Sequence, residues 1–556
     1  MCRPLTRREL LRYGALVAAT FPTARLLRDD FSLSGRAFAA GPAVPTNLEL
    51  VTVSDTVAVM TWLTADVTDP DEFGRPRPIA APGRVLIGTS PDPSSWEVVG
   101  EHDATPYHYV EVRDLTPGTT YYWRAESAGV PATSSAISLP NAGLAAPPSF
   151  STLIPPPGRE LGTVAWLNDL HIGEMTSGLA YGNSALPGGG FPPGFAVDPD
   201  NPYWRFMAQA CVRESRTRGA TLMLANGDLT SEAEPPEVAE ARAALDAFGR
   251  LGGPRALSPS SEPAYFVTRG NHDRLHSGAK WEDCSAAGEL RDCYRDAFAS
   301  SFDPGTGHFS VSLGDDRARY RFVGLDSTAP DGTGVMTDDE LSYLSTELDR
   351  GDATFVLCHH GASDLATTLA VPPVVFGIER NSQAKLRSVL GGADNVAAVY
   401  NAHTHRNLRT TATDTGSLPF FEGGAVKEYP GGYTTVRLFE GGYLVNFWRV
   451  QDPEARAWVE RSRGEYLGLY PYYTLGSLSD RNWARAMDAR VTTGPGASPS
   501  PTASPTPRPG ADKNGSNGGL PATGGAAALA VAAAAAATAA TATVTSTRRA
   551  PDPRES

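Results

Sequence analysis

Cysteine and positive charge are both scarce in this chain. Only five cysteines occur in 556 residues, and no two form a C-x-x-C pair, so nothing points to a zinc site built on thiolates. Acidic residues outnumber basic ones by 62 to 48, which gives a formal net charge of −14. A large basic surface for nucleic acid is therefore not expected, although a small pocket can still be positive. The length allows two to four domains.

The cysteines that are present fall into two kinds. Cys284 and Cys293 are close enough in sequence to form a disulfide in an oxidising compartment, and two free thiols are the open alternative. Cys211 lies in a helix-like stretch and Cys358 at the end of an apolar segment. Both are therefore expected to be buried.

The first 40 residues carry the pattern of an export signal. Arg7 and Arg8 precede a mildly apolar run over 13–21, and Ala37-Phe38-Ala39 is a small-x-small cleavage pattern. The segment resembles a twin-arginine signal, which implies export machinery as a partner. A basic amphipathic helix is the alternative.

The last 63 residues carry a second processing pattern. Residues 494–519 are rich in Pro, Ser, Thr and Gly, a composition that forms extended stalks rather than cores. Leu520-Pro521-Ala522-Thr523-Gly524 follows, then an alanine-rich stretch and Arg548-Arg549. This order over 520–556 resembles a sortase sorting signal, which implies attachment to peptidoglycan in the cell wall of a Gram-positive bacterium. A low-complexity alanine tail is the alternative.

Residues 41–147 show the pattern of an all-β module. The segments 48–53, 57–62, 84–88 and 107–112 are apolar or alternate between apolar and polar residues, as strands do. The stretch from Leu115 to Trp123 resembles the turn and strand of a fibronectin type III sandwich. A proline-rich linker separates this module from the next domain.

The domain predicted over 159–450 contains six short apolar segments, each followed by polar residues. The segments are 162–167, 220–225, 265–268, 320–325, 354–357 and 396–400. The residues that follow them are Asp169 and His171, Asp228, Asn271 with His272 and Asp273, Asp326, His359 with His360, and His403 with His405. Helix-like stretches such as 236–251 and 338–348 separate several segments. Strands alternating with helices predict an α/β fold, in which such residues meet outside the carboxyl ends of the strands.

Carboxylate, imidazole and carboxamide together suit Zn, Fe or Mn. Asp228 is the natural candidate to bridge two ions, and a pair of ions can activate water against a phosphate ester. His272 follows a proposed ligand directly, so it can donate a proton without binding metal. Asp273 is then expected to hold the His272 ring in one orientation.

The order D-x-H, G-D, G-N-H-D, H and H-x-H resembles the signature of the calcineurin-like metallophosphoesterases, with the secreted actinobacterial members nearest. The resemblance spans about 162–450 and implies a two-layered β-sandwich flanked by helices, with two metal ions. By position, Asp169, His171 and His405 would hold one ion, and Asn271, His359 and His403 would hold the other, with Asp228 bridging and His272 donating a proton.

The chain departs from that signature at two positions, and it also differs from a sister group. Gly361 stands where proline is common, which leaves the choice between His359 and His360 open, and Ala402 replaces a common glycine. Purple acid phosphatases carry a similar amino-terminal module, but they have an iron-binding tyrosine after the second motif. Leu229 to Glu232 occupy that place here, so no iron–tyrosinate colour is expected.

The sequence as a whole predicts an exported, wall-attached phosphoesterase that hydrolyses phosphate mono- or diesters of small molecules. A wall-bound binding or adhesion protein that keeps the fold without turnover is the alternative. Residues 451–493 are predicted to form a C-terminal extension of the catalytic domain.

Overall fold

A computed structural model of the chain describes residues 43–68, 76–100, 103–134, 146–177, 195–274, 297–302, 307–329, 332–364, 377–465, 471 and 474–490. The chain divides into two compact units, 1–43 and 44–556, and the account below concerns the second. The predicted export signal, stalk and sorting signal lie outside the described residues, as do Cys284 and Cys293. None of the helices in the described ranges has the length and hydrophobicity that a bilayer crossing requires.

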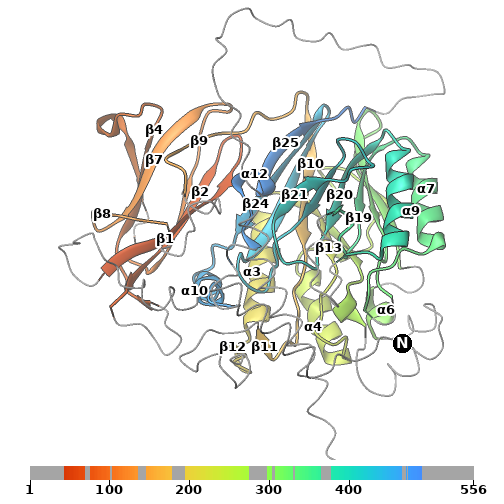
Figure 1. Cartoon of the computed structure of the whole chain (residues 1–556), viewed down its shortest axis with the longest axis horizontal. Helices are drawn as coiled ribbons and strands as arrows, with labels where there is room; N and C mark the ends of the chain where they lie inside the picture. The colour runs from red at the N-terminus through yellow and green to blue at the C-terminus, as the bar shows by residue number, and fades with distance from the viewer. Residues whose placement is uncertain are drawn as a thin grey trace, which may run out of the picture. The chain divides into compact units, whose positions relative to one another are not determined.

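Residues 43–151 form a sandwich of two antiparallel sheets, shown in red and orange in Figure 1. One sheet contains β1 (Ala43–Val53), β2 (Ala58–Asp66), β3 (Arg77–Pro78) and β6 (Tyr107–Val112). The other contains β4 (Gly83–Gly88), β5 (Glu97–Gly100), β7 (Thr120–Ser127), β8 (Val130–Pro131) and β9 (Ser149–Ser151). Trp62, Val85, Trp123 and Phe150 are in its core. The predicted all-β module is confirmed.

The following domain contains two seven-stranded sheets that face each other. The first runs in the order β14 (Arg250–Leu251), β16 (Ala264–Thr268), β13 (Ala220–Asn226), β10 (Glu160–Leu167), β23 (Gly432–Phe439), β24 (Gly442–Arg449) and β25 (Asn482–Ala486). The second runs in the order β15 (Ala256–Leu257), β17 (Phe309–Gly314), β18 (Arg319–Gly324), β19 (Ala353–Leu357), β20 (Val396–Asn401), β22 (Pro419–Glu422) and β21 (Leu408–Thr411). All six predicted strands are present. Strand β25 lies beyond the expected end of the domain at 450.

Strand residues alternate between two apolar cores, as the period of two requires. In β10, Val164 and Trp166 belong to the core between the two sheets. Their neighbours Ala165 and Leu167 belong to the core on the outer face of the first sheet. Because both faces of β10 are buried, the strand is a continuous apolar run in the sequence.

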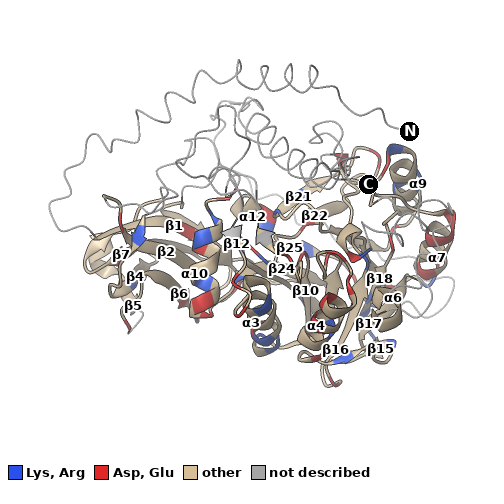
Figure 2. Cartoon of the chain, turned by 90° about the horizontal axis from the view of Figure 1, so that it is seen from below, with Lys and Arg blue, Asp and Glu red and all other residues tan. Residues whose placement is uncertain are grey.

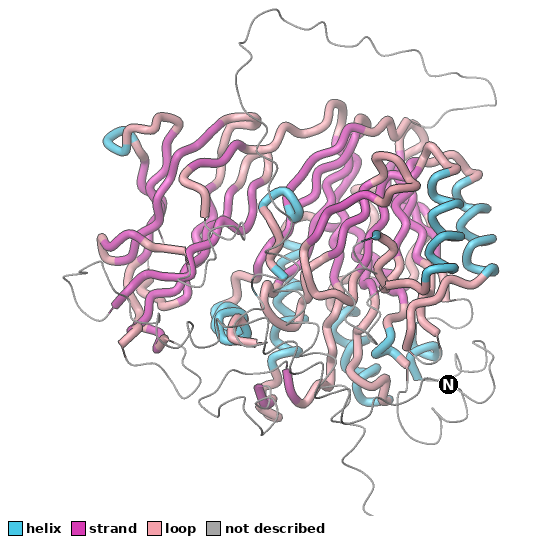
Figure 3. Tube along the Cα trace, in the orientation of Figure 1, coloured by secondary structure: helices cyan, strands magenta, loops and turns pink. Residues whose placement is uncertain are grey.

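Helices cover the outer faces of both sheets, which gives the predicted α/β architecture of a β-sandwich flanked by helices (Figure 3). The helices α3 (Tyr203–Thr217), α4 (Pro235–Asp246) and α10 (Pro453–Ser462) share a core with the first sheet. The helices α7 (Asp338–Leu348) and α9 (Arg380–Gly391) lie side by side against the second sheet. Three shorter helices also lie in the described part of this domain: α6 (Ala297–Phe302), α12 (Leu478–Arg481) and the 3-10 turn η2 (Asn271–Asp273).

Helix α7 illustrates how local sequence fixes an element. The Thr337 side chain accepts a hydrogen bond from the Glu340 amide and so caps the first turn. Asp338, Asp339 and Glu340 place negative charge at the positive end of the helix dipole, visible in Figure 2 as red at α7. The expected range of 338–348 matches the observed one.

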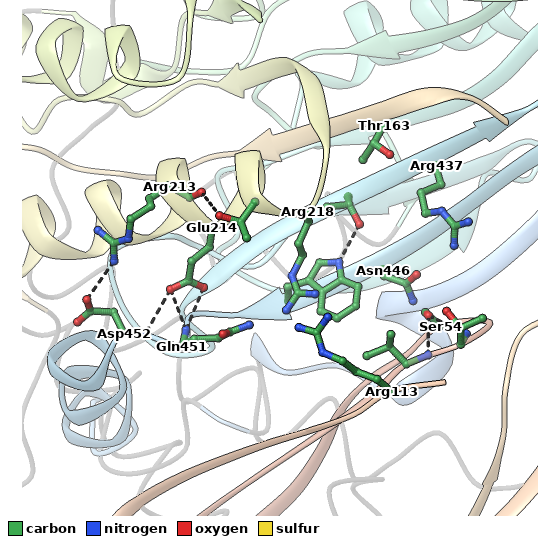
Figure 4. A pocket seen from close by; sticks show the side chains of 15 residues that line it. Ser54, Arg113, Thr163, Arg213, Glu214, Arg218, Arg437, Asn446, Gln451 and Asp452 are labelled. Carbon is green, nitrogen blue, oxygen red and sulfur yellow. Dashed lines mark hydrogen bonds and ion pairs between the residues drawn. The ribbon is translucent and has the colours of Figure 1, made fainter. Parts of the chain in front are cut away.

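Buried polar contacts join the sandwich to the two-sheet domain. Glu49 of β1 accepts hydrogen bonds from Tyr429 Oη at 2.6 Å and from Arg449 Nη1 at 2.5 Å, and it also pairs with Arg463. A cavity of about 540 Å³ lies along the same junction (Figure 4). Its arginines already have acidic partners, such as Glu111 for Arg218 at 2.8 Å. None of the predicted metal ligands lines this cavity, so it is not the predicted site.

Candidate metal centre

The predicted ligands gather at one end of the two facing sheets. Strands β10, β13 and β16 are mutually parallel in the first sheet, and β18, β19 and β20 are parallel in the second. The polar groups lie directly after the carboxyl ends of these strands, where open α/β sheets collect ligands. Residues up to 236 positions apart in sequence, from Asp169 to His405, therefore meet.

Two groups of side chains could each hold a metal ion, and they share one residue. Asp169, His171, Asp228 and His405 form the first group, and Asp228, His359 and His403 form the second. Within each group, the potential ligand atoms lie within 4.8 Å of one another. The seventh predicted ligand, Asn271, places its Oδ1 3.1 Å from His359 Nε2, beside the second group. The structure thus brings all seven together.

Asp228 presents a single oxygen to both groups. Its Oδ1 accepts the backbone N–H of His272 at 2.8 Å. Its Oδ2 lies 3.5 Å from His171 Nε2 in one group and 3.2 Å from His359 Nε2 in the other. Because the first oxygen is held by the backbone, the second is fixed in the position that a bridging carboxylate oxygen needs.

The donor set fits a pair of transition-metal ions. His171 Nε2 is buried and has no hydrogen-bond partner, which is costly unless a cation occupies the space before it. Carboxylate and imidazole donors without thiolate suit Mn, Fe or Zn. The second oxygen of Asp169 is held by Asn168 Nδ2 at 2.6 Å, so the ligand carboxylates have fixed orientations.

Five ligands adopt a backbone conformation that is rare outside glycine. Positive φ angles, from 46° to 66°, occur at Asp169, His171, Asp228, His403 and His405. They account for five of the nine such non-glycine residues in the described ranges. Each costs about 1–3 kcal/mol and persists only where the surroundings impose it. Their concentration at one sheet edge marks this as a functional site.

Two motif glycines are required by close packing under the site. A Cβ on Gly227, where φ is +84°, would lie 2.5 Å from His359 Nδ1 and 2.8 Å from the Gly270 backbone. A Cβ on Gly270 would lie 2.2 Å from the Asp228 nitrogen. Any side chain at either position would push apart the strands that carry Asp228 and His359.

The adjacent residues His359 and His360 have different partners in the structure. The Nε2 atom of His359 faces Asp228 and Asn271, while its Nδ1 is 2.9 Å from the Asn226 carbonyl. Both ring nitrogens of His360 have partners elsewhere: Ser327 Oγ at 3.1 Å and the Gly332 carbonyl at 3.3 Å. His359 is therefore the member of the pair that belongs to the second ligand group, and His360 does not.

The expected role of Asp273 is wrong. Its carboxylate accepts hydrogen bonds from the Thr230 amide and hydroxyl and from the Gly270 amide, and none of these partners belongs to the His272 ring. Instead, the His272 ring is oriented by the Ser231 carbonyl, 2.8 Å from Nδ1. Asp273 follows His272 in a tight 3-10 turn. The turn directs its side chain into the backbone of the neighbouring loop rather than along the ring.

The electrostatics of the site favour cations. Burial lowers the pKa of His171 and His403 well below the ordinary value, so both rings are neutral. Burial alone would also lower the pKa of His359, but the Asp228 carboxylate outweighs it and raises the pKa to about 9. The position in front of Asp228 Oδ2 therefore attracts positive charge strongly, as a metal site must.

Sequence reasoning missed one carboxylate at the site. Glu428 lies in the loop between β22 and β23, and its Oε1 is 2.7 Å from His405 Nδ1. It follows no strand directly and belongs to none of the motifs, so only the fold brings it to the ligand. Asp326, in contrast, stands after β18 as predicted and pairs with Arg274 at 3.3 Å, outside both ligand groups.

No protein-family model and no curated protein matches this chain. Among solved structures, a dimetal phosphatase from Danio rerio is 13% identical, with a TM-score of 0.34 over 52% of this chain and 96% of that one. A purple acid phosphatase from yellow lupin is 12% identical, with a TM-score of 0.35 over 74% and 73%. PhoD is 11% identical, with a TM-score of 0.32 over 74% and 87%. Scores this low add nothing to what the geometry of the site says about function.

Proposed function

We propose that this protein is a two-metal phosphoesterase that hydrolyses phosphate mono- or diesters of small molecules. The observation that carries the proposal is the single oxygen of Asp228, which lies 3.5 Å from a ligand nitrogen of one group and 3.2 Å from one of the other. A carboxylate in that position holds two cations side by side, the arrangement used for in-line displacement at phosphorus.

The chain supplies the ligands of both ions and a proton donor beside them. Two bound ions would neutralise the phosphoryl oxygens and activate a water for attack. Asp169, His171 and His405 would hold one ion on one side of Asp228, and Asn271, His359 and His403 would hold the other on the opposite side. The His272 ring lies 4.6 Å from that of His171, centroid to centroid, and is only partly buried.

His272 is suited to protonate the leaving oxygen. Its Nδ1 is engaged by the Ser231 carbonyl, which fixes the orientation of the ring beside the two ligand groups. Neither nitrogen is needed for metal, because both ligand groups are complete without this residue.

The test uses para-nitrophenyl phosphate and its bis ester. The protein is stripped with a chelator and reloaded with Mn²⁺, and hydrolysis of each ester is followed by absorbance. Turnover of at least one ester that depends on the metal is the expected result. Two bound ions with turnover of neither ester would favour a binding protein that keeps the fold. A panel of phosphorylated metabolites then identifies the substrate class.

The same proposal places the enzyme outside the cell, on the wall of a Gram-positive bacterium. Its support is the sequence alone: the twin-arginine pattern in 1–40, the stalk over 494–519 and the sorting signal over 520–556. Sortase and peptidoglycan would be partners through Leu520 to Gly524. Replacing Thr523 with Ala should release the protein from the wall fraction into the medium, and retention in that fraction would contradict attachment by sortase.

A further inference from the structure

A buried cluster of charged side chains lies behind His405. Glu428 contacts the ring through Oε1, as described above. Its other oxygen, Oε2, lies 3.3 Å from Lys427 Nζ and 3.0 Å from Ser177 Oγ. Lys427 is 4% exposed and also binds both oxygens of Glu174, at 2.6 and 2.7 Å. The two oxygens of Glu428 therefore face different neighbours.

This cluster connects two loops that carry members of the same ligand group. Glu174 and Ser177 belong to the segment that follows Asp169 and His171, and Glu428 backs His405. Ser177 also lies 2.6 Å from Glu465, which is fully buried. The second ligand group has a simpler support, because the Nδ1 atom of His359 faces a backbone carbonyl.

The contact with Glu428 fixes which nitrogen of His405 faces the first ligand group. A carboxylate only accepts hydrogen bonds, so Nδ1 carries a proton, and a metal ion would be bound through Nε2. That Nε2 atom lies 3.5 Å from Asp169 Oδ1 in the first ligand group. Partners of this kind are known to orient metal-binding histidines.

We propose that Glu428 is the positioning residue of His405, and that Lys427 in turn fixes the orientation of Glu428. The inference rests on the proposed two-metal site but not on turnover.

Replacing Glu428 with Gln tests this orientation because an amide has two different ends. Lys427 only donates hydrogen bonds, so the amide oxygen turns toward it and the NH₂ group turns toward His405. Nδ1 of His405 must then accept, its proton moves to Nε2, and that nitrogen can no longer bind metal. E428Q should therefore retain one of two Co²⁺ ions about 10- to 100-fold more weakly, with the other unchanged.

The double variant K427M/E428Q distinguishes a lost orientation of His405 from a general disruption of the buried cluster. Without the ammonium group, the amide can turn its oxygen back to Nδ1. The double variant should therefore retain Co²⁺ more strongly than E428Q, although less strongly than the wild type. E465Q is the matched control, because Glu465 is equally buried and contacts Ser177 and Glu428 in the same cluster, and because an amide at 465 can still donate a hydrogen bond to the Glu428 carboxylate. Its Co²⁺ retention should match the wild type.

Retention is measured on the full chain by competition with a chelator and by elemental analysis, and thermal unfolding checks the fold. The visible spectrum of bound Co²⁺ should change in E428Q and return toward the wild type in the double variant. If E428Q does not fold, E428D takes its place, because the shorter carboxylate cannot reach Nδ1.

The proposal would be overturned if E428Q, or E428D in its place, retained Co²⁺ as strongly as the wild type. It would also be overturned if the double variant retained Co²⁺ more weakly than E428Q. Two bound Co²⁺ ions without hydrolysis of any ester would refute the proposed function and leave this inference standing. Normal turnover with equal retention in E428Q and wild type would refute only the positioning role.

Discussion

Glu49 is expected to contribute more to stability than any exposed ion pair of this protein. It is 4% exposed and lies between Arg449 and Arg463. Burial alone would raise the pKa of its carboxyl, but the two arginines and the Tyr429 hydroxyl outweigh burial and lower the pKa from 4.5 to about 2. One pKa unit is worth about 1.4 kcal/mol, so ionised Glu49 contributes about 3 kcal/mol to the free energy of unfolding.

The pH dependence has a definite sign. Because the pKa is lower in the folded state, the contribution is fully present above pH 4.5 and is lost as the pH falls toward 2. E49Q should lower the free energy of unfolding by about 3 kcal/mol at pH 7 and by only about 1 kcal/mol at pH 3. Urea unfolding followed by tryptophan fluorescence at both pH values measures the difference.

Asp55 offers the matched control at the same junction. It pairs with Arg437 at 2.7 Å, but that arginine is 30% exposed. D55N should therefore cost about 1 kcal/mol or less. The reasoning fails if E49Q costs no more than D55N, or if the effect of E49Q is the same at pH 7 and pH 3.

Three further predictions concern the metal centre. D228A should lose both ions and all turnover, because one oxygen faces both ligand groups; elemental analysis that finds two ions would contradict the bridge. H272A should keep both ions but slow turnover by about 10²-fold or more. That loss should be greater with phenyl phosphate than with the para-nitrophenyl ester, and an equal loss would remove His272 as the proton donor. H359A should lose metal, while H360A should keep both ions. Equal metal content in the two variants would contradict the distinction between His359 and His360.

Much of the fold could be predicted because its determinants are local. A strand buried on both faces is a short apolar run, which is how the segments that became β10, β13 and β16 were recognised. Cys211 and Cys358 are buried as expected. The sequence also predicts the seven residues of the two ligand groups, since each follows a strand whose end fixes its place at the sheet edge.

Other features depend on contacts between distant parts of the chain. His359 and His360 are adjacent in sequence, and only the position of Asp228, 131 residues earlier, distinguishes them. Asp273 is adjacent to His272 in sequence, but the 3-10 turn directs its side chain to Thr230 and Gly270. Strand β25 pairs with β24 by backbone hydrogen bonds that leave little trace in composition.

The sequence by itself determined which chemical groups are available and which strands carry them, because hydrophobic periodicity and residue type are local properties. The tertiary structure decided which oxygen of Asp228 faces both ligand groups, which histidine of a pair faces it, and that Glu428 backs His405. These choices follow from side-chain directions set by left-handed backbone angles and by loops that meet only after the two sheets have packed.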